Sequence, residues 1–238
     1  MNGAWTTDEM MTVEAARRLA DGTVCFVGIG LPSLAANLAR RTHAPACVLI
    51  YESGTIGAKP TAPPLSIGDG ELAETADFNV SVPEMFAYWL QGGHVDVGFL
   101  GAAQIDRHGN LNSTVIGDYD RPTVRLPGAG GAPEIARACG EIFVLLRQSP
   151  RAFVAQLDFR TSDGGRVSTV VTDLGILAPD PESRELTLVA LHPGATLEQA
   201  RAATGWELRA AADLEQTEPP TEAELNALRA LRRKGVPA

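Results

Sequence analysis

The strongest constraint on the fold lies in residues 23–52, where two apolar runs flank one helix-like run. Residues 23–30 (TVCFVGIG) run into glycines, and residues 47–52 (CVLIYE) form the second apolar run. Residues 31–41 between them place leucine and alanine at helical spacing, with Ser33 as the expected N-cap. Because strand, helix and strand follow closely, the two strands are expected to pair in parallel with the helix as crossover. The sequence therefore predicts an α/β fold.

The rest of the chain continues this alternation, and we predict one domain over residues 1–238. Helices are expected after Thr6 and within residues 83–93, 196–204 and 221–234, the last forming a C-terminal helical extension from about residue 215. Further strands are expected in the short apolar runs FNVSV (78–82), VDVGFL (95–100), NSTVIGDY (112–119), IFVLL (142–146), STVVTD (168–173) and LTLVA (186–190).

Composition narrows the class of protein. The 238 residues are 45% hydrophobic, enough to bury a core, and the formal net charge is -9. Scattered basic residues argue against a nucleic-acid partner, which needs a concentrated basic face. Without a secretory signal or an apolar run near the ~20 residues of a membrane span, we expect a soluble cytoplasmic protein. Cys25, Cys47 and Cys139 lack metal or redox spacing, so we expect buried small side chains and no metal site.

Glu52 is the first candidate for chemistry. The stretch LIYESGTIG ends an apolar strand on this acid, and Ser53, Gly54 and Gly57 follow at once. An acid at a strand end is ordinarily a solvated surface group. The carboxyl ends of parallel strands are, however, where α/β proteins bind their ligands, which makes a catalytic role for Glu52 a hypothesis to weigh against the surface one.

Two glycine-containing turns are candidate anion sites. Gly28 and Gly30 lie between a strand and a helix, where bare backbone N–H groups can face an anion, although a turn that needs glycine is the more ordinary explanation. Gly128, Gly130 and Gly131 precede a helix expected to begin between residues 132 and 134. Their unobstructed N–H groups suit a phosphate or an oxyanion formed in acyl transfer.

Neutral amides mark a further candidate segment. Gln104 and Asn110 lie in GAAQIDRHGNLNST, residues 101–114, and can bind amide or carbonyl groups without adding charge. The alternative is ordinary turn chemistry, in which Asp106 and Asn110 fold back on their own backbone and His108 lies at the loop tip.

Five motifs follow one another along the chain: GIGLP, ESG, GAAQIDRHGNLNST, GDY and GAGGA. Taken together and in this order, they resemble the β subunit of family I CoA-transferases, most closely the glutaconate CoA-transferase branch, with 3-oxoacid and 3-oxoadipate CoA-transferases as further relatives. The resemblance runs from about Thr7 to about Gly205, and no single motif decides it.

The resemblance implies an open layered α/β/α fold with a mainly parallel sheet, and Glu52 as a nucleophile that forms a glutamyl-CoA thioester. It also implies that the glycine loop of residues 128–131 contributes to the oxyanion site. As oxyanion or CoA-binding residues we therefore predict Gly130 and Gly131, together with the candidates Gly28, Gly30, Gln104 and Asn110. Coenzyme A is then a substrate, with no tightly bound cofactor, and a separate α subunit of related fold is the expected partner in an α2β2 assembly.

Two alternatives stay open at this point. Some relatives of the superfamily hydrolyse CoA thioesters or open rings of them, but they lack the glutamate that this chain has. Effector-binding domains of sugar-responsive repressors share a related layout and bind sugar phosphates, yet the N-terminal stretch offers no DNA-binding segment. Many 3-oxoacid relatives carry Glu-Asn-Gly where this chain has Glu-Ser-Gly, which favours the glutaconate-like branch and leaves the acid undetermined.

Overall fold

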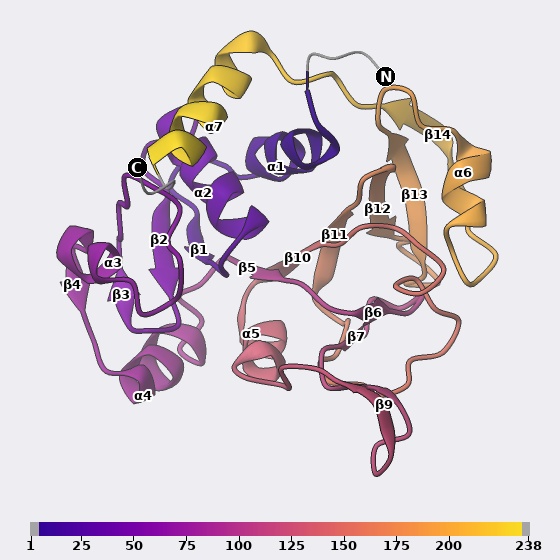
Figure 1. The fold of residues 1–238 in the computed structure, drawn as a ribbon, viewed down its shortest axis with the longest axis horizontal. Helices are drawn as coiled ribbons and strands as arrows, with labels where there is room; N and C mark the ends of the chain where they lie inside the picture. Colours follow the sequence, from indigo (N-terminus) through magenta and orange to yellow (C-terminus); the bar gives the residue numbers. More distant parts are fainter. Residues whose placement is uncertain (1–4, 235–238) are drawn as a thin grey trace. The chain divides into compact units, whose positions relative to one another are not determined.

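The computed structural model describes residues 5–234, and the chain forms two compact units (Figure 1). Unit 1 contains residues 5–99, 138–140 and 219–234, and unit 2 contains residues 100–137 and 141–218. The C-terminal segment therefore returns to the unit in which the chain begins. The description as a single domain with an extension from about residue 215 stays a prediction.

Unit 1 is built on a sheet in the strand order β5-β1-β2-β3-β4. Helices α1, α2 and α7 belong to the same unit, as do three short helices beside strands β3 to β5. The bounds are α1 Thr7–Arg17, β1 Val24–Phe26, α2 Leu31–Arg41, β2 Val48–Tyr51, β3 Thr55–Ile56, α3 Gly70–Thr75, β4 Phe78–Asn79, α4 Val82–Glu84, η1 Met85–Leu90, β5 Val97–Leu100 and α7 Glu222–Lys234.

The predicted parallel pair with its crossover helix is confirmed. Strands β1 and β2 pair in parallel, with Cys25 opposite Leu49 and Phe26 opposite Ile50, and β5 pairs in parallel with the other side of β1. The side chains of β1, β2 and β5 are almost continuously buried, as expected where a parallel sheet is covered on both faces. Parallel pairing places the carboxyl ends of β1 and β2 side by side.

Helices α1 and α7 are held together by two ion pairs. Both helices begin at capping threonines: Thr6 accepts from the N–H of Glu9, and Thr221 accepts from the N–H of Glu224. The same two glutamates then bind across the helix pair, Arg229 Nε lying 2.7 Å from Glu9 and Arg17 Nε lying 2.7 Å from Glu224. Each glutamate therefore both caps its own helix and fixes the other helix against it.

These ion pairs predict a loss of stability in acid. The hydrogen bond from Arg229 lowers the pKa of Glu9 to about 2. Burial opposes the shift at Glu224, but hydrogen bonds from Arg17 and Thr221 lower its pKa to about 2 as well. Both values lie below those of the unfolded chain, so the added stability is present above about pH 4.5 and is lost as the pH falls towards 2.

We expect each carboxylate to contribute about 2 kcal/mol to the free energy of unfolding at pH 7, discounted for the exposure of its arginine partner. Urea unfolding at pH 7, 5 and 3 measures the loss. Glu9→Gln should flatten the pH dependence, whereas Glu222→Gln, at an exposed residue of the same helix pair, should keep it. An equal pH dependence in the wild type and Glu9→Gln would show that the pair of Glu9 and Arg229 does not contribute to the pH dependence of the free energy of unfolding.

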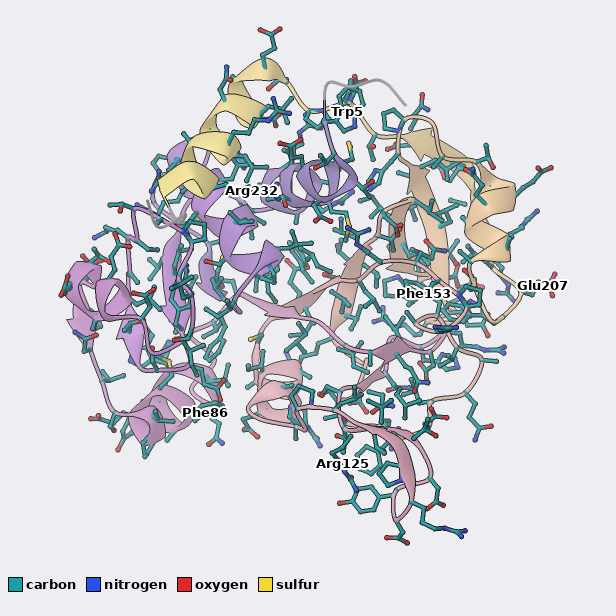
Figure 2. All side chains as sticks on the ribbon, in the orientation of Figure 1. Trp5, Phe86, Arg125, Phe153, Glu207 and Arg232 are labelled. Carbon is teal, nitrogen blue, oxygen red and sulfur yellow. The ribbon has the colours of Figure 1, made fainter. Side chains whose placement is uncertain are left out.

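Unit 2 contains five neighbouring sheet strands and two small β-ribbons. The five strands follow the order β14-β13-β12-β11-β10, with β10–β11 and β13–β14 parallel and the other two pairs antiparallel. Phe153 stacks on Trp206, their ring centroids 5.8 Å apart, and Figure 2 labels Phe153 within this unit. The bounds are β6 Gln104–Ile105, β7 Leu111–Asn112, β8 Val115–Gly117, β9 Pro122–Arg125, α5 Ala132–Ala138, β10 Glu141–Leu145, β11 Val167–Val171, β12 Gly175–Pro179, β13 Leu186–Leu191, α6 Leu197–Ala202 and β14 Ala210–Gln216.

The α/β class is confirmed, and β5, β1 and β2 are neighbouring parallel strands in unit 1. Two expectations differ in detail. The helix expected over residues 83–93 is a short α4 that continues as the π-helix η1, and Ser33 is not the N-cap of α2. Between residues 5 and 234, no helix is long and apolar enough to cross a membrane.

Candidate active site at the ends of β1 and β2

Glu52 lies at the first position of a tight hairpin turn between β2 and β3. The N–H of Gly54 donates to the carbonyl of Tyr51 (3.0 Å), and Tyr51 pairs with Thr55 across the hairpin. Gly54 has a φ of 98°, so the loop is a three-residue hairpin that closes on a residue of left-handed conformation. The turn fixes the Cα of Glu52 directly beyond the buried strand.

The glycines that follow Glu52 have backbone reasons of their own. A Cβ on Gly54 would lie 2.0 Å from the carbonyl oxygen of Val80, and one on Gly57 would lie 2.1 Å from the carboxylate of Asp77. Both residues also have positive φ. Positive φ at both residues and the close backbone contact at Gly54 therefore favour glycine independently of any chemistry at Glu52.

The carboxylate of Glu52 has no partner in the part of the chain that the structure describes. The side chain is half-buried, and within residues 5–234 it takes part in no hydrogen bond or ion pair. The neighbouring Ser53 and Thr55 hydroxyl oxygens are buried and likewise unpartnered in the described chain. A carboxylate held by its backbone and not by a salt bridge keeps its lone pairs available for chemistry.

The GIGLP loop lies beside this turn. The N–H of Val27 donates to the carbonyl of Ile50 (2.8 Å), so the segment after β1 stays next to the end of β2. The four backbone N–H groups of residues 28–31 bind no other group among residues 5–234, and Gly30 caps α2 with a φ of 88°. Free N–H groups at the start of an 11-residue helix make this loop suited to a negatively charged group.

Ser33 serves a different purpose from the one predicted. It lies inside the first turn of α2, fully buried, with its Oγ 3.0 Å from the hydroxyl of Tyr51. Asn37, one turn further along α2, donates from Nδ2 to the carbonyl of Ser33 (2.9 Å) and to the Tyr51 hydroxyl (3.4 Å). No sequence motif marked this cluster, because its members come from separate elements that meet only in the fold.

Gln104 and Asn110, expected at the ligand, are engaged inside unit 2. Gln104 is buried, donates to Asp158 (2.9 Å) and accepts from Asn112 (2.7 Å). Asn110 donates to Asp106 (2.9 Å) and accepts from the N–H of Gly164 (3.0 Å). Their amides hold loops together as in ordinary turn chemistry, and the ligand-binding role assigned to them stays a prediction.

The glycine loop of residues 128–131 also lies in unit 2, and hydrogen bonds to Ser113 hold its first residue. Gly128 donates its N–H to the carbonyl of Ser113 (2.9 Å) and accepts from the Ser113 hydroxyl (2.8 Å). Gly130 has a φ of 49° and open space around its Cα, and α5 then starts at Ala132 as predicted. The carbonyl of Gly131 accepts the N–H of Ile135, so Gly131 acts as the helix cap.

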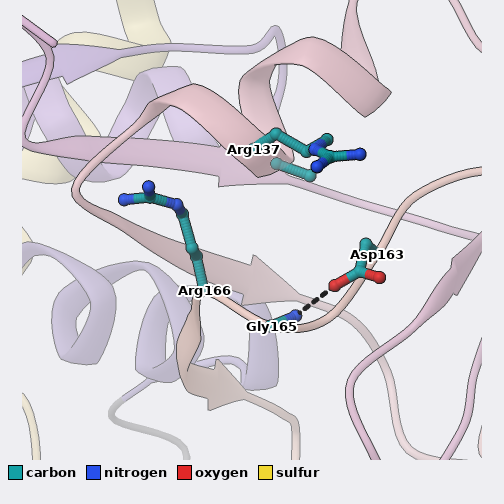
Figure 3. A pocket seen from close by; sticks show the side chains of 5 residues that line it. Arg137, Asp163, Gly165 and Arg166 are labelled. Carbon is teal, nitrogen blue, oxygen red and sulfur yellow. Dashed lines mark hydrogen bonds between the residues drawn. The ribbon is translucent and has the colours of Figure 1, made fainter.

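A hollow of about 360 Å³ in unit 2 was not anticipated from the sequence. Figure 3 shows Arg137 from α5 and Arg166 from the segment before β11 at its wall, with Asp163 nearby accepting from the N–H of Gly165 (2.8 Å). The arginines come from separate segments, which is why no motif revealed them. Within the described residues, no group of histidine, cysteine and acidic side chains is arranged to hold a metal ion.

Comparisons with known proteins agree with this architecture. Residues 8–203 match the family described as Coenzyme A transferase. The chain is 58% identical to a 3-oxoadipate CoA-transferase subunit of Pseudomonas knackmussii, across 99% of this chain and 96% of the relative. It is 34% identical to a glutaconate CoA-transferase subunit of Acidaminococcus fermentans, across 90% of this chain and 89% of the relative.

A solved structure shows the same fold. The crystal structure of glutaconate coenzyme A-transferase from Acidaminococcus fermentans matches with a TM-score of 0.90 and 31% identity, covering 96% of this chain and 95% of that one. The chain therefore belongs to the coenzyme A transferase family. Within that family it is an enzyme chain of the β-subunit type.

Gly54 in the Glu52 turn and Gly28 in the GIGLP loop should respond differently to alanine. Gly54→Ala should lower the free energy of unfolding by about 2 kcal/mol or more, because the methyl group meets the Val80 carbonyl and φ is positive. Gly28→Ala is the matched control: Gly28 is not left-handed and has open space, so we expect a change below about 1 kcal/mol. Urea unfolding of both variants measures this, and equal losses would contradict it.

Proposed function

We propose that Glu52 is the nucleophile with which this CoA-transferase chain moves CoA between an acyl-CoA and a free carboxylic acid. The observation that carries the proposal is the carboxylate itself, which has no partner among residues 5–234 and is fixed at a tight turn beyond a buried strand. Its position matches the glutamate that the resemblance to family I CoA-transferases implies. Covalent catalysis needs such a group, since a salt-bridged carboxylate would lose nucleophilicity.

The proposed reaction is a ping-pong sequence. A Glu52 carboxylate oxygen attacks the thioester carbonyl carbon, and the carbon–sulfur bond breaks. CoA departs as a thiolate, and Glu52 is converted into an acyl-glutamyl anhydride. The thiolate then attacks the glutamyl carbonyl carbon, which releases the first acid as a carboxylate and forms a glutamyl-CoA thioester. An incoming carboxylate repeats both steps in reverse, so Glu52 is regenerated and no proton is consumed.

The GIGLP loop supports the negative charge of this sequence in our proposal. Each step passes through an oxyanion, and the free N–H groups of residues 28–31 lie beside the strand that ends at Glu52. Preorganised donors of this kind stabilise developing charge without reorganisation. The resemblance assigns a similar role to Gly130 and Gly131, and that role stays a prediction.

For the acid, we propose a dicarboxylic 3-oxo acid of the 3-oxoadipate kind. The support is the 58% identity, over almost the whole length of both chains, to a relative named for 3-oxoadipate. The Glu-Ser-Gly motif favoured the glutaconate-like branch, but the relative named for glutaconate is only 34% identical. Measuring transfer from one acyl-CoA donor to 3-oxoadipate and to glutaconate tests this choice.

Glu52 should carry a covalent CoA adduct. Incubated with acyl-CoA and no acceptor acid, the enzyme assembled with its α-type subunit should gain the mass of CoA less water, and peptide mapping should place it within residues 47–59. Glu52→Ala should lose both adduct and transfer. Glu52→Asp should be severely impaired, because withdrawing the carboxylate by about 1 Å spoils the attack geometry.

Glu74→Ala provides the matched control, since Glu74 is an exposed acid of the same unit and should leave adduct and transfer unchanged. Near-normal transfer by Glu52→Ala, or an adduct mapped to another acid, would overturn the assignment. Release of free CoA without any acceptor acid, at a rate similar to transfer, would instead support the hydrolase alternative.

We also propose that the chain works with a separate α-type subunit, as an α2β2 assembly. The support is that both relatives are named as one subunit of their enzyme. The purified chain alone should fold but show no transfer, and adding the α-type chain should restore transfer. Full transfer by the isolated chain would contradict this, and light scattering of the mixture reports the stoichiometry.

A further inference from the structure

A buried polar cluster joins the Glu52 turn to the GIGLP loop. Tyr51 and Ser33 have no exposed surface and Asn37 has 2%, and the Tyr51 hydroxyl lies 3.0 Å from Ser33 Oγ and 3.4 Å from Asn37 Nδ2. Asn37 is satisfied further by the Ser33 carbonyl (2.9 Å) and by Arg40, which donates to its Oδ1 (3.3 Å). The cluster is therefore complete, without an unused side-chain group on its three central members.

Its place in the chain sets it apart from other buried polar groups. Tyr51 immediately precedes Glu52, and Ser33 follows the free N–H groups of residues 28–31 within the same helical turn. Apart from Ser33 and Asn37, the buried residues of α2 are leucine and alanine. Packing against these apolar side chains alone would not need a hydroxyl at position 51, and a phenylalanine could fill that place. Burial raises the pKa of Tyr51, so the hydroxyl stays neutral and able both to donate and to accept.

Satisfied networks of this kind hold their members in one arrangement, because any displacement leaves a buried donor or acceptor unpaired. We propose that Tyr51, Ser33 and Asn37 are positioning residues that fix the Glu52 carboxylate relative to the N–H groups of residues 28–31. None of them touches the reacting atoms. The inference rests on the proposed role of Glu52.

Tyr51→Phe and Ser33→Ala test the inference in the enzyme assembled with its α-type subunit. Each variant breaks the same hydrogen bond. We expect kcat and the single-turnover rate of adduct formation to fall by about 10-fold or more, with KM for acyl-CoA changed less than about 3-fold. The adduct should still map to Glu52. Should Tyr51→Phe fold poorly, Ser33→Ala is the milder change, since alanine favours the helix.

The rate of the double variant shows whether the two single variants lose the same interaction. Because both substitutions remove the shared bond between Tyr51 and Ser33, the rate loss of Tyr51→Phe with Ser33→Ala should be smaller than the product of the two single losses. Thr12→Val is the matched control: Thr12 is fully buried in α1 and donates to the carbonyl of Asp8 (2.6 Å), so its loss should lower stability without changing kcat.

Three outcomes are distinguishable. Absence of the adduct in the wild type would contradict both the proposed function and this inference. A wild-type adduct on Glu52, with both single variants within about 2-fold of the wild-type kcat and adduct rate, would overturn the positioning role alone. Rate losses that multiply in the double variant would also overturn it, because they would show two independent effects.

Discussion

The parallel pairing of β1 with β2 is the constraint on which the rest of the site depends. Its register, with Phe26 opposite Ile50, brings both strands to an end at the same level. The hydrogen bond from Val27 to Ile50 extends that contact by one residue beyond β1. A carboxylate that follows one strand and a row of free N–H groups that follows the other are therefore neighbours by topology, before any side chain is considered.

Different residues of the Glu52 turn provide its backbone conformation and its chemistry. Gly54 and Gly57 have positive φ and abut Val80 and Asp77, so their role is to close the hairpin and pack it. The carboxylate has no partner within residues 5–234, and its position is set by strand β2 and the turn. A nucleophile held in this way pairs a rigid Cα with an uncommitted side chain, which is what covalent acyl transfer needs.

Much of the fold could be predicted from short-range patterns. Capping residues such as Thr6 and Thr221 mark helix starts because their hydroxyls bind N–H groups only three residues on. The α2 start could not be assigned this way: Ser33 is a good N-cap by type, but the positive φ of Gly30 begins the helix earlier and Tyr51 binds the serine. Strands β12 and β14 were missed because their composition is untypical of strands: β12 is bounded by Gly175 and Pro179, and β14 is rich in alanine and acidic residues.

The sequence by itself determined the α/β alternation and the placement of Glu52 at a strand end, because both follow from local apolar periodicity and from the glycines after the acid. It also determined the family, through five motifs whose order is written along the chain. Only the tertiary structure decided which of those motif residues are available: it engages Gln104 and Asn110 with Asp158 and Asp106, and it leaves Glu52 without a partner among the residues described. The physical reason is that hydrogen-bond satisfaction is a property of neighbours in space, and residues such as Tyr51 and Ser33 become neighbours only when strand and helix pack together.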